Sequence, residues 1–330
     1  MDASTLGKID IKGPDSAEFL NRVYTNRWDN LAIGKCKYGL MLKEDGMIFD
    51  DGVTSRISED HFHMSTTSSG ASNVLNWMEE LLQTEWPDLK VFLTSVTEQW
   101  SVITISGPNS KKLLIDANCD TDLDDNNFPL MTFKGANISG LPVNIFRISF
   151  TGEISYEINI KNKLAFSLWK RLIEVGKKYD LTPYGTEAMH VLRAEKGFII
   201  VGQETDGTVT PHDLGMSWIV SKNKNDFIGK RALERNSMND NSRKQLVGLV
   251  TINPNIVIPE GAHAILDKNQ ELPYDMLGHV TSSYYSPNLG KSIALALLKN
   301  GTSLHGKTVW LPQINGNDPI EAKVTKSAFM

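Results

Sequence analysis

The chain has 330 residues and a net charge of −5, and hydrophobic residues make up 40% of it. This length and composition are typical of a globular protein of about two domains. The acidic balance argues against a nucleic-acid partner, because phosphate binding needs a basic surface. The two cysteines, Cys36 and Cys119, are too few for a disulfide framework or a metal-ligand cluster.

The ends and the apolar runs of the sequence also bear on location. No apolar run approaches the roughly 18 residues that cross a bilayer. The N-terminus has no charged segment followed by an apolar one, so it is not a secretory signal. We therefore expect a soluble, cytoplasmic protein with no membrane contact.

A strand–turn–helix pattern occurs twice. In "KIDIKGPDSAEFLNRV" (8–23), alternating isoleucines precede a Gly-Pro turn, and apolar residues then follow at helical spacing. "VITISGPNSKKLLIDA" (102–117) repeats this order. Proline suits the first turn of a helix, and the Asp, Asn or Ser beside it can cap the exposed amides. The repetition predicts two related α+β lobes.

Further elements follow from the spacing of apolar residues. Alternation predicts strands over 36–42, 47–54 and 61–66, and over two segments of 141–160 that flank the turn "TGE". Helical spacing predicts helices over 72–82, 163–179 and 185–198, the last of which ends near Gly197. The polar stretch 235–245 is a candidate linker. Short strands with frequent turns follow it, and they predict an all-β module of barrel or roll type.

Two adjacent acids, Asp50 and Asp51, interrupt the apolar strand pattern of "DGMIFDDGVTSR" (45–56). Successive strand residues point to opposite faces, so Asp51 shares a face with Met47, Phe49 and Val53. On this pattern Asp51 is a lone carboxylate among core-facing side chains, where burial would raise its pKa. The alternative is that the strand ends at Phe49 and both acids lie in a solvated turn.

Other candidate residues are weaker. His61 and His63 share one strand face, but two ligands do not complete a zinc site, and surface histidines are the simpler interpretation. Glu157 lies with Ser155 and Asn159 on the polar face of a strand, which is typical of solvated residues. The sequence contains no phosphate-binding glycine loop and no nucleophile elbow. Composition and spacing alone therefore give no substrate.

Five motifs in chain order resemble one family. They are "IFDDGVTS", "RISFTGEISYEINI", "LRAEKGFIIVGQETD", "DFIGKRAL" and "YSPNLGKSIALALL". Together they resemble the folate-dependent T-protein, or aminomethyltransferase, family over about residues 1–329. Segments such as "CKYGLML" and "TSVTEQW" are more similar to the C-terminal half of the alpha subunit of heterotetrameric sarcosine oxidases.

The resemblance implies an α+β fold with ferredoxin-like lobes and a C-terminal β-barrel, arranged as a cloverleaf around a central folate site. On this basis residues 1–240 would form the folate-binding region with its two related lobes. Residues 241–330 would form the barrel domain. The half that precedes this region in the alpha subunits is absent from the sequence, which suggests a fragment.

The resemblance also implies a reaction. In sarcosine oxidases a flavin on the beta subunit oxidises sarcosine to an iminium, and the T-protein-like domain supplies tetrahydrofolate to take up the one-carbon unit. The products are 5,10-methylenetetrahydrofolate and glycine. The implied partners are the flavin-containing beta subunit and the small subunits, and no metal is implied. A carboxylate beside the folate amine would orient it and stabilise developing positive charge.

Site residues follow by matching the motifs position by position. The catalytic aspartate of the family matches Asp51, a tyrosine in the preceding strand matches Tyr38, and the glutamate that holds the pterin matches Glu157. "STTSS" occupies the place of another pterin-contacting stretch, where Thr66 or Thr67 would supply a polar contact.

One departure from the family concerns position 189, where Met189 replaces the arginine that binds near the glutamate tail of folate in T-proteins. Polyglutamate affinity would then be lower, unless a lysine or arginine from elsewhere takes its place. Two alternatives to the oxidase subunit stay open. One is a free-standing folate-dependent aminomethyltransferase or demethylase, and the other is a folate-binding or assembly module without chemistry of its own.

Overall fold

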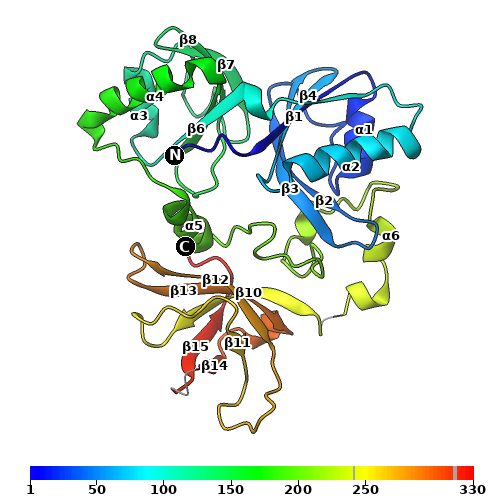
Figure 1. The fold of residues 1–330 in the computed structure, drawn as a ribbon, viewed down its shortest axis with the longest axis vertical. Coiled ribbons are helices and arrows are strands. Elements are labelled where there is room, and N and C mark those ends of the chain that lie inside the picture. The colour runs from blue at the N-terminus through cyan, green and yellow to red at the C-terminus, as the bar shows by residue number, and fades with distance from the viewer. Residues whose placement is uncertain (241, 315–317) are drawn as a thin grey trace. The chain divides into compact units, whose positions relative to one another are not determined.

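The computed structural model describes residues 1–240, 242–314 and 318–330. Residue 241, at which the predicted barrel domain begins, lies outside these ranges. The chain divides into two compact units (Figure 1). Unit 1 comprises Met1–Met41, Asp50–Thr186 and Ser221–Ile228, and unit 2 comprises Leu42–Phe49, Glu187–Val220 and Gly229–Met330. Within the described ranges, no helix is both long enough and apolar enough to cross a membrane.

The first sheet of unit 1 has the strand order β2-β3-β4-β1-β5, and the pairs β1–β4, β1–β5 and β3–β4 are antiparallel. Buried apolar residues of helices α1 and α2 pack against one face of this sheet, which contributes Ile9 and Ile11 from β1. The elements are β1 Gly7–Lys12, α1 Ser16–Val23, β2 Cys36–Leu42, β3 Ile48–Ser58, β4 His61–Thr66, α2 Ala71–Thr84 and β5 Phe92–Ser95.

The second sheet of unit 1 has the order β6-β9-β8-β7 and is also antiparallel. Its core includes Ile103, Ile105, Leu113 and Leu114, which are the counterparts of the apolar residues in the first lobe. The elements are η1 Thr97–Gln99, β6 Trp100–Ser106, α3 Ser110–Asp116, β7 Phe133–Ile138, β8 Leu141–Phe146, β9 Ser155–Lys161, α4 Asn162–Gly176 and η2 Lys177–Tyr179.

The predicted repeat is present as β1–α1 and β6–α3, but the predicted side-chain caps are not. Neither Asp15 nor Asn109 caps its helix. The Asp15 carboxylate instead accepts the Lys90 amide at 2.8 Å. The Ser110 hydroxyl donates to the Ile154 carbonyl at 3.1 Å. These side chains therefore fix neighbouring loops to the turn rather than satisfying helix amides.

Unit 2 contains a six-stranded sheet of order β11-β12-β13-β10-β15-β14. An isolated bridge between Ile265 and Trp310 connects the two ends of this order, so the sheet curls into a nearly closed barrel around an aliphatic core. The elements are α5 Thr186–Glu195, η3 Ser217–Ile219, α6 Lys230–Leu233, η4 Asn236–Met238, β10 Lys244–Thr251, β11 His263–Ala264, β12 Gly278–Ser286, β13 Lys291–Lys299, η5 Gly301–Leu304, β14 Thr308–Leu311 and β15 Ile320–Thr325.

Candidate folate and one-carbon site

One face of the first sheet is lined by polar and titratable side chains. Antiparallel pairing places Ser55 opposite His63, and His63 opposite Asp10, so these three side chains share a face. Lys8 pairs with Ser65 on the same face. The other face carries the apolar residues that pack on the helices. The sheet therefore separates a helix-covered apolar side from a polar side.

The two aspartates both lie within β3, so the solvated-turn alternative is wrong. The strand period separates them as predicted, but the expectation that the Asp51 face is the core is also wrong. Asp50 is 1% exposed and shares the buried face with Ile48 and Thr54, whereas Asp51 is only half-buried. Residues 42–49 belong to unit 2 and residues from 50 onwards to unit 1, so the apolar pattern of 47–49 says little about the surroundings of Asp51.

Asp51 forms a close pair with Tyr38. The Tyr38 hydroxyl donates to Asp51 Oδ2 at 2.6 Å. Burial, together with the negative charge of Asp50, raises the pKa of Asp51 to about 7, although the Tyr38 hydrogen bond acts in the opposite direction. Burial and the Asp51 charge also raise the pKa of Tyr38, so the phenol stays protonated and remains a donor. A carboxyl poised near neutrality can hold or release a proton at physiological pH.

Asp50 lies at the start of helix α2. Its Oδ1 accepts the Asp51 amide at 2.9 Å. A side chain at Gly70 would place its Cβ 2.2 Å from Asp50 Oδ2, so glycine is needed for this close approach. Burial raises the pKa of Asp50, and hydrogen bonds from Asp51 and Thr67 oppose that rise. Asp50 is thus fixed on the helix side of the sheet.

Thr66 and Thr67 lie with Asp50 rather than with Asp51. Thr66 is 1% exposed, and its hydroxyl donates to the Thr67 carbonyl at 3.0 Å. The Thr67 hydroxyl accepts the Gly70 amide at 3.0 Å. Both hydroxyls therefore already have local partners. Their predicted contact with a pterin stays a prediction.

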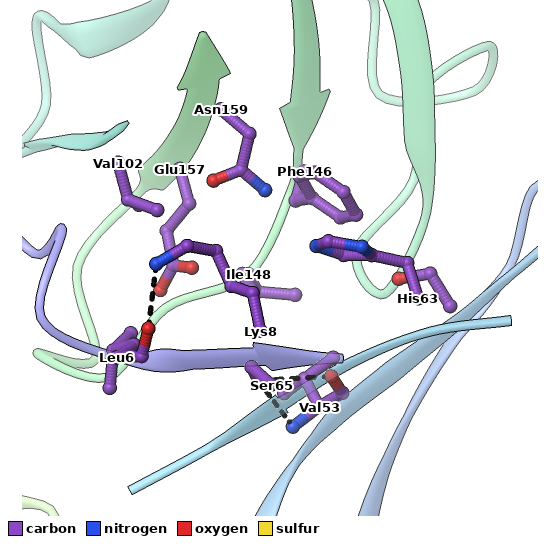
Figure 2. A pocket seen from close by; sticks show the side chains of 11 residues that line it. Leu6, Lys8, Val53, His63, Ser65, Val102, Phe146, Ile148, Glu157 and Asn159 are labelled. Atoms are coloured by element: carbon purple, nitrogen blue, oxygen red, sulfur yellow. Dashed lines mark hydrogen bonds between the residues drawn. The ribbon is translucent and has the colours of Figure 1, made fainter. Parts of the chain in front are cut away.

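A narrow slot lies between the polar face of the first sheet and the second sheet of unit 1 (Figure 2). The cavity measures about 20 Å³, which is room for about one water molecule. Val53 and Ser55 line the cavity, and they follow Asp51 on the same face of β3. Asp51 is two strand residues from Val53 and therefore lies about 7 Å from the cavity wall. The lining residues are Leu6, Lys8, Val53, Ser55, His63, Ser65, Val102, Phe146, Ile148, Glu157 and Asn159.

Glu157 projects into this slot, so its interpretation as a solvated strand residue is wrong. Ser155 and Asn159 on the same face are also buried, because this face of β9 turns inward. Burial raises the pKa of Glu157 to about 7, against the attraction of the nearby Lys8. The Lys8 ammonium donates to the carbonyls of Ser4 and Leu6, at 2.9 and 2.6 Å. The carboxyl of Glu157 therefore retains capacity to accept hydrogen bonds.

His61 and His63 are half-buried rather than ordinary surface residues. His63 Nδ1 lies 2.8 Å from Asp10 Oδ1, and His61 Nε2 lies 3.3 Å from Asp10 Oδ2. His63 also stacks on Phe146, with ring centroids 6.1 Å apart. The sequence could not reveal this cluster, because Asp10 comes from a strand 53 residues away. In the described part of the chain, no group of three or more potential ligands could hold a metal ion.

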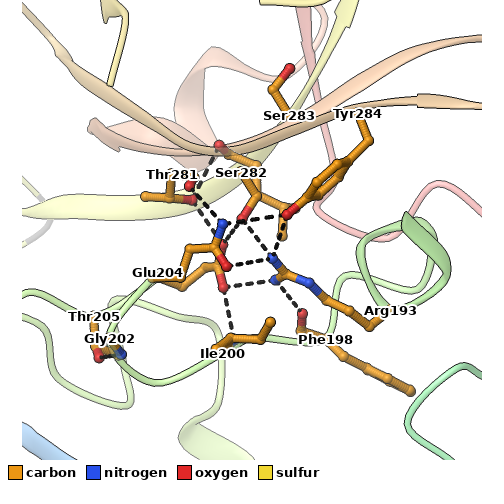
Figure 3. A network of polar contacts seen from close by, with 12 residues as sticks. Arg193, Phe198, Ile200, Gly202, Glu204, Thr205, Thr281, Ser282, Ser283 and Tyr284 are labelled. Atoms are coloured by element: carbon orange, nitrogen blue, oxygen red, sulfur yellow. Dashed lines mark hydrogen bonds and ion pairs between the residues drawn. The ribbon is translucent and has the colours of Figure 1, made fainter. Parts of the chain in front are cut away.

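The motif "RAEKGFIIVGQETD" builds a buried polar network in unit 2 (Figure 3). Arg193 and Glu204 are fully buried and form an ion pair of 2.8 Å. Arg193 also donates to the Phe198 carbonyl at 2.9 Å and to the Ser282 hydroxyl at 2.7 Å. Glu204 further accepts the Ile200 amide at 2.8 Å. The network ties helix α5 and the following loop to strand β12, and this assigns the motif a structural role.

Comparisons with known proteins agree with this architecture. Two family models match the chain: the GCVT N-terminal domain over residues 1–224 and the glycine cleavage T-protein C-terminal barrel domain over residues 244–330. The crystal structure of the glycine cleavage system aminomethyltransferase T from Bartonella henselae superposes with a TM-score of 0.86 at 23% identity, covering 100% of this chain and 85% of that one. The predicted T-protein type of fold, with its C-terminal barrel, is confirmed.

Curated relatives have two kinds of name. The sarcosine oxidase subunit alpha of Corynebacterium sp. (strain P-1) is 49% identical over 319 residues, which are 96% of this chain and 33% of that subunit. The chain thus spans about a third of the length of that relative. The aminomethyltransferase of Chloroherpeton thalassium is 30% identical over 329 residues, which are 100% of this chain and 86% of that protein. The chain belongs to the glycine cleavage T-protein family.

Proposed function

We propose that this chain is the tetrahydrofolate-binding domain of a sarcosine oxidase alpha subunit. It would transfer the one-carbon unit of the sarcosine-derived iminium to tetrahydrofolate, giving 5,10-methylenetetrahydrofolate and glycine. The observation that carries the proposal is the Tyr38–Asp51 pair, whose carboxyl is poised near pH 7 beside a slot that contains Glu157. The similarity to sarcosine oxidase alpha subunits supports the choice of reaction.

The residues of the slot fit a folate ring. Val102, Phe146 and Ile148 supply apolar contacts, and Glu157 and Asn159 supply hydrogen-bond acceptors. A pterin presents ring and amino N–H groups that such acceptors bind. Because the cavity holds only about one water, a ring enters only if lining side chains move.

Asp51 would act on the amine that forms the new bond. Tetrahydrofolate supplies two amine nitrogens that can share a one-carbon unit. The Asp51 carboxylate orients one of these amines and offsets the positive charge that develops as its lone pair attacks carbon. Tyr38 fixes the orientation of the carboxylate through its 2.6 Å hydrogen bond. The pKa near 7 also lets Asp51 take a proton from the amine.

The oxidation step would take place on other chains. We propose a flavin-containing beta subunit and small subunits as partners, and the 48–49% identity to sarcosine oxidase alpha subunits supports this choice. Co-purification of this chain with a flavin subunit tests the assignment. A second candidate is a free-standing aminomethyltransferase, which the match over 86% of such an enzyme favours. Turnover of a methylamine donor by the isolated chain would select that candidate.

The role of Asp51 is tested by Asp51→Asn, with Asp50→Asn as the matched variant on the other strand face. We expect the first to lower formation of methylenetetrahydrofolate roughly a hundredfold or more. We expect the second to matter less, because Asp50 faces the helices. Binding is tested separately, since saturating tetrahydrofolate should raise the melting temperature of the wild type. An Asp51→Asn variant as fast as wild type would exclude the proposed role.

A further inference from the structure

His63 connects the slot to Asp10 on the neighbouring strand. Its ring lines the cavity and stacks on Phe146 (Figure 2). One ring nitrogen, Nδ1, lies 2.8 Å from Asp10 Oδ1. The side chains of His63 and Asp10 are 12% and 15% exposed, so water competes little for this contact. Because Nδ1 is engaged by Asp10 and the ring lines the slot, Nε2 is the ring nitrogen that has no hydrogen bond to Asp10.

Asp10 decides which nitrogen of His63 carries the proton. Burial alone would raise the pKa of Asp10. Hydrogen bonds from His61 and His63 instead hold this pKa well below its ordinary value. The ionised carboxylate accepts hydrogen bonds and donates none. His63 must therefore carry a proton on Nδ1, and in the neutral ring Nε2 is left with its lone pair. The Asp10 carboxylate thereby makes Nε2 an acceptor.

Two further acceptors face the same space. Asn159 is 7% exposed, and its Oδ1 accepts no hydrogen bond from the described residues. Glu157 offers a carboxylate, and the nearby Lys8 ammonium donates two of its three hydrogens to backbone carbonyls. A buried acceptor without a donor is costly, so an occupant that carries several N–H groups would relieve this cost.

We propose that His63, oriented by Asp10, is a third acceptor of the slot and selects ligands by their N–H donors. This rests on the proposed folate function and adds to it a recognition element. His63 contacts the ligand edge through Nε2. Asp10 is a positioning residue that acts only through His63. The slot would then bind a ligand whose ring edge presents N–H donors, as an aminopyrimidine does, in preference to a ligand whose ring edge presents acceptors.

Among the described residues, the ionisable side chains near His63 include Asp10, Lys8 and Lys12 on β1, His61 on β4, and Glu157 across the slot on β9. Glu157 loses acceptor capacity when it is protonated. The contribution of His63 must therefore be separated from that of Glu157 by mutation.

The experiment measures the affinity of 5-formyltetrahydrofolate, a stable reduced folate, by calorimetry at neutral pH. His63→Phe keeps a ring against Phe146 but removes both nitrogens, and it should weaken binding roughly tenfold. His61→Phe is the matched control, because His61 contacts Asp10 but does not line the slot. It should change affinity less than about threefold. His63→Gln places an amide oxygen there as an acceptor and should restore most of the affinity that His63→Phe loses.

Two further measurements test Asp10. Nitrogen-15 spectra of the free protein should show that the neutral His63 ring carries its proton on Nδ1. Asp10→Asn should weaken binding as much as His63→Phe, with no added loss in the double variant. The inference is overturned if His63 carries its proton on Nε2, or if His61→Phe and His63→Phe weaken binding equally. A wild type that binds no reduced folate, yet shows the expected His63 tautomer, would instead refute the proposed function and with it the ligand class.

Discussion

The substitution Asp51→Asn measures how strongly the fold opposes ionisation of the Asp51 carboxyl. Asn nearly matches Asp in shape, and its side-chain oxygen can still accept the Tyr38 hydroxyl, but it does not ionise. Burial is the main reason that the pKa of Asp51 rises from 3.8 to about 7. The folded protein therefore holds this proton more tightly than the unfolded chain does.

The sign of the effect follows from that difference. The stability that Asp51 contributes is fully present below pH 3.8 and is lost as the pH rises through about 7. A rise of this size corresponds to about 4 kcal/mol. Because the residue is partly exposed, solvent reduces the effect, and we expect about 2 to 4 kcal/mol. Asp51→Asn should be more stable than wild type by this amount at about pH 8.

The assay is urea unfolding of both proteins at about pH 8 and about pH 4.5, with the free energy of unfolding as the readout. Most of the advantage of the variant should disappear at the lower pH. Asp60→Asn, at an exposed turn position between β3 and β4, is the control and should stay within about 0.5 kcal/mol of wild type at both values. An Asp51→Asn effect that does not change with pH would show that the carboxyl is solvated and not poised.

Three further perturbations act on single contacts. Tyr38→Phe removes the hydrogen bond that lowers the pKa of Asp51, so the acidic limb of the pH–rate profile should move to higher pH. Glu157→Gln should be more stable than wild type at about pH 8 but not at about pH 4.5, since burial raises the pKa of Glu157 to about 7. The same variant should show a smaller rise in melting temperature on addition of folate. Arg193→Met leaves Glu204 buried without its cation and should cost about 3–5 kcal/mol, measured by urea unfolding. Replacing both partners by apolar residues should cost less than Arg193→Met alone.

Periodicity was sufficient for most elements of the first lobe. The predicted strand 36–42 coincides with β2, and the predicted helix 72–82 falls within α2. Strand β5 was missed because it exposes most of its side chains, and strand β7 was missed because its apolar residues Phe133, Ala136 and Ile138 do not alternate. The predicted division of the chain near residue 240 stays a prediction.

The candidate site was predictable only in part, because strand period gives faces but not their surroundings. It correctly separated Asp50 from Asp51 and grouped Glu157 with Asn159. The strand period did not indicate that the face of Asp50 packs on helices or that the face of Glu157 lines a slot. A polar strand face has the same sequence pattern whether it meets water or a buried polar cavity. The pairing of Asp10 with His63 depends on strand register, which one sequence does not reveal.

The carboxyl groups of Glu204, Asp51 and Glu157 differ in how well the protein satisfies them. Glu204 accepts hydrogen bonds from Arg193, from the Ile200 amide and from hydroxyls of β12, so its charge is compensated within the protein. Asp51 accepts one side-chain hydrogen bond, from Tyr38. Within the described residues the carboxylate of Glu157 accepts none, and its pKa is raised accordingly. A fold that only needed stability would replace such groups or pair them, since uncompensated buried charge is costly. This contrast supports the proposal that Asp51 and Glu157 act on a ligand, whereas the Arg193 network holds the elements of unit 2 together.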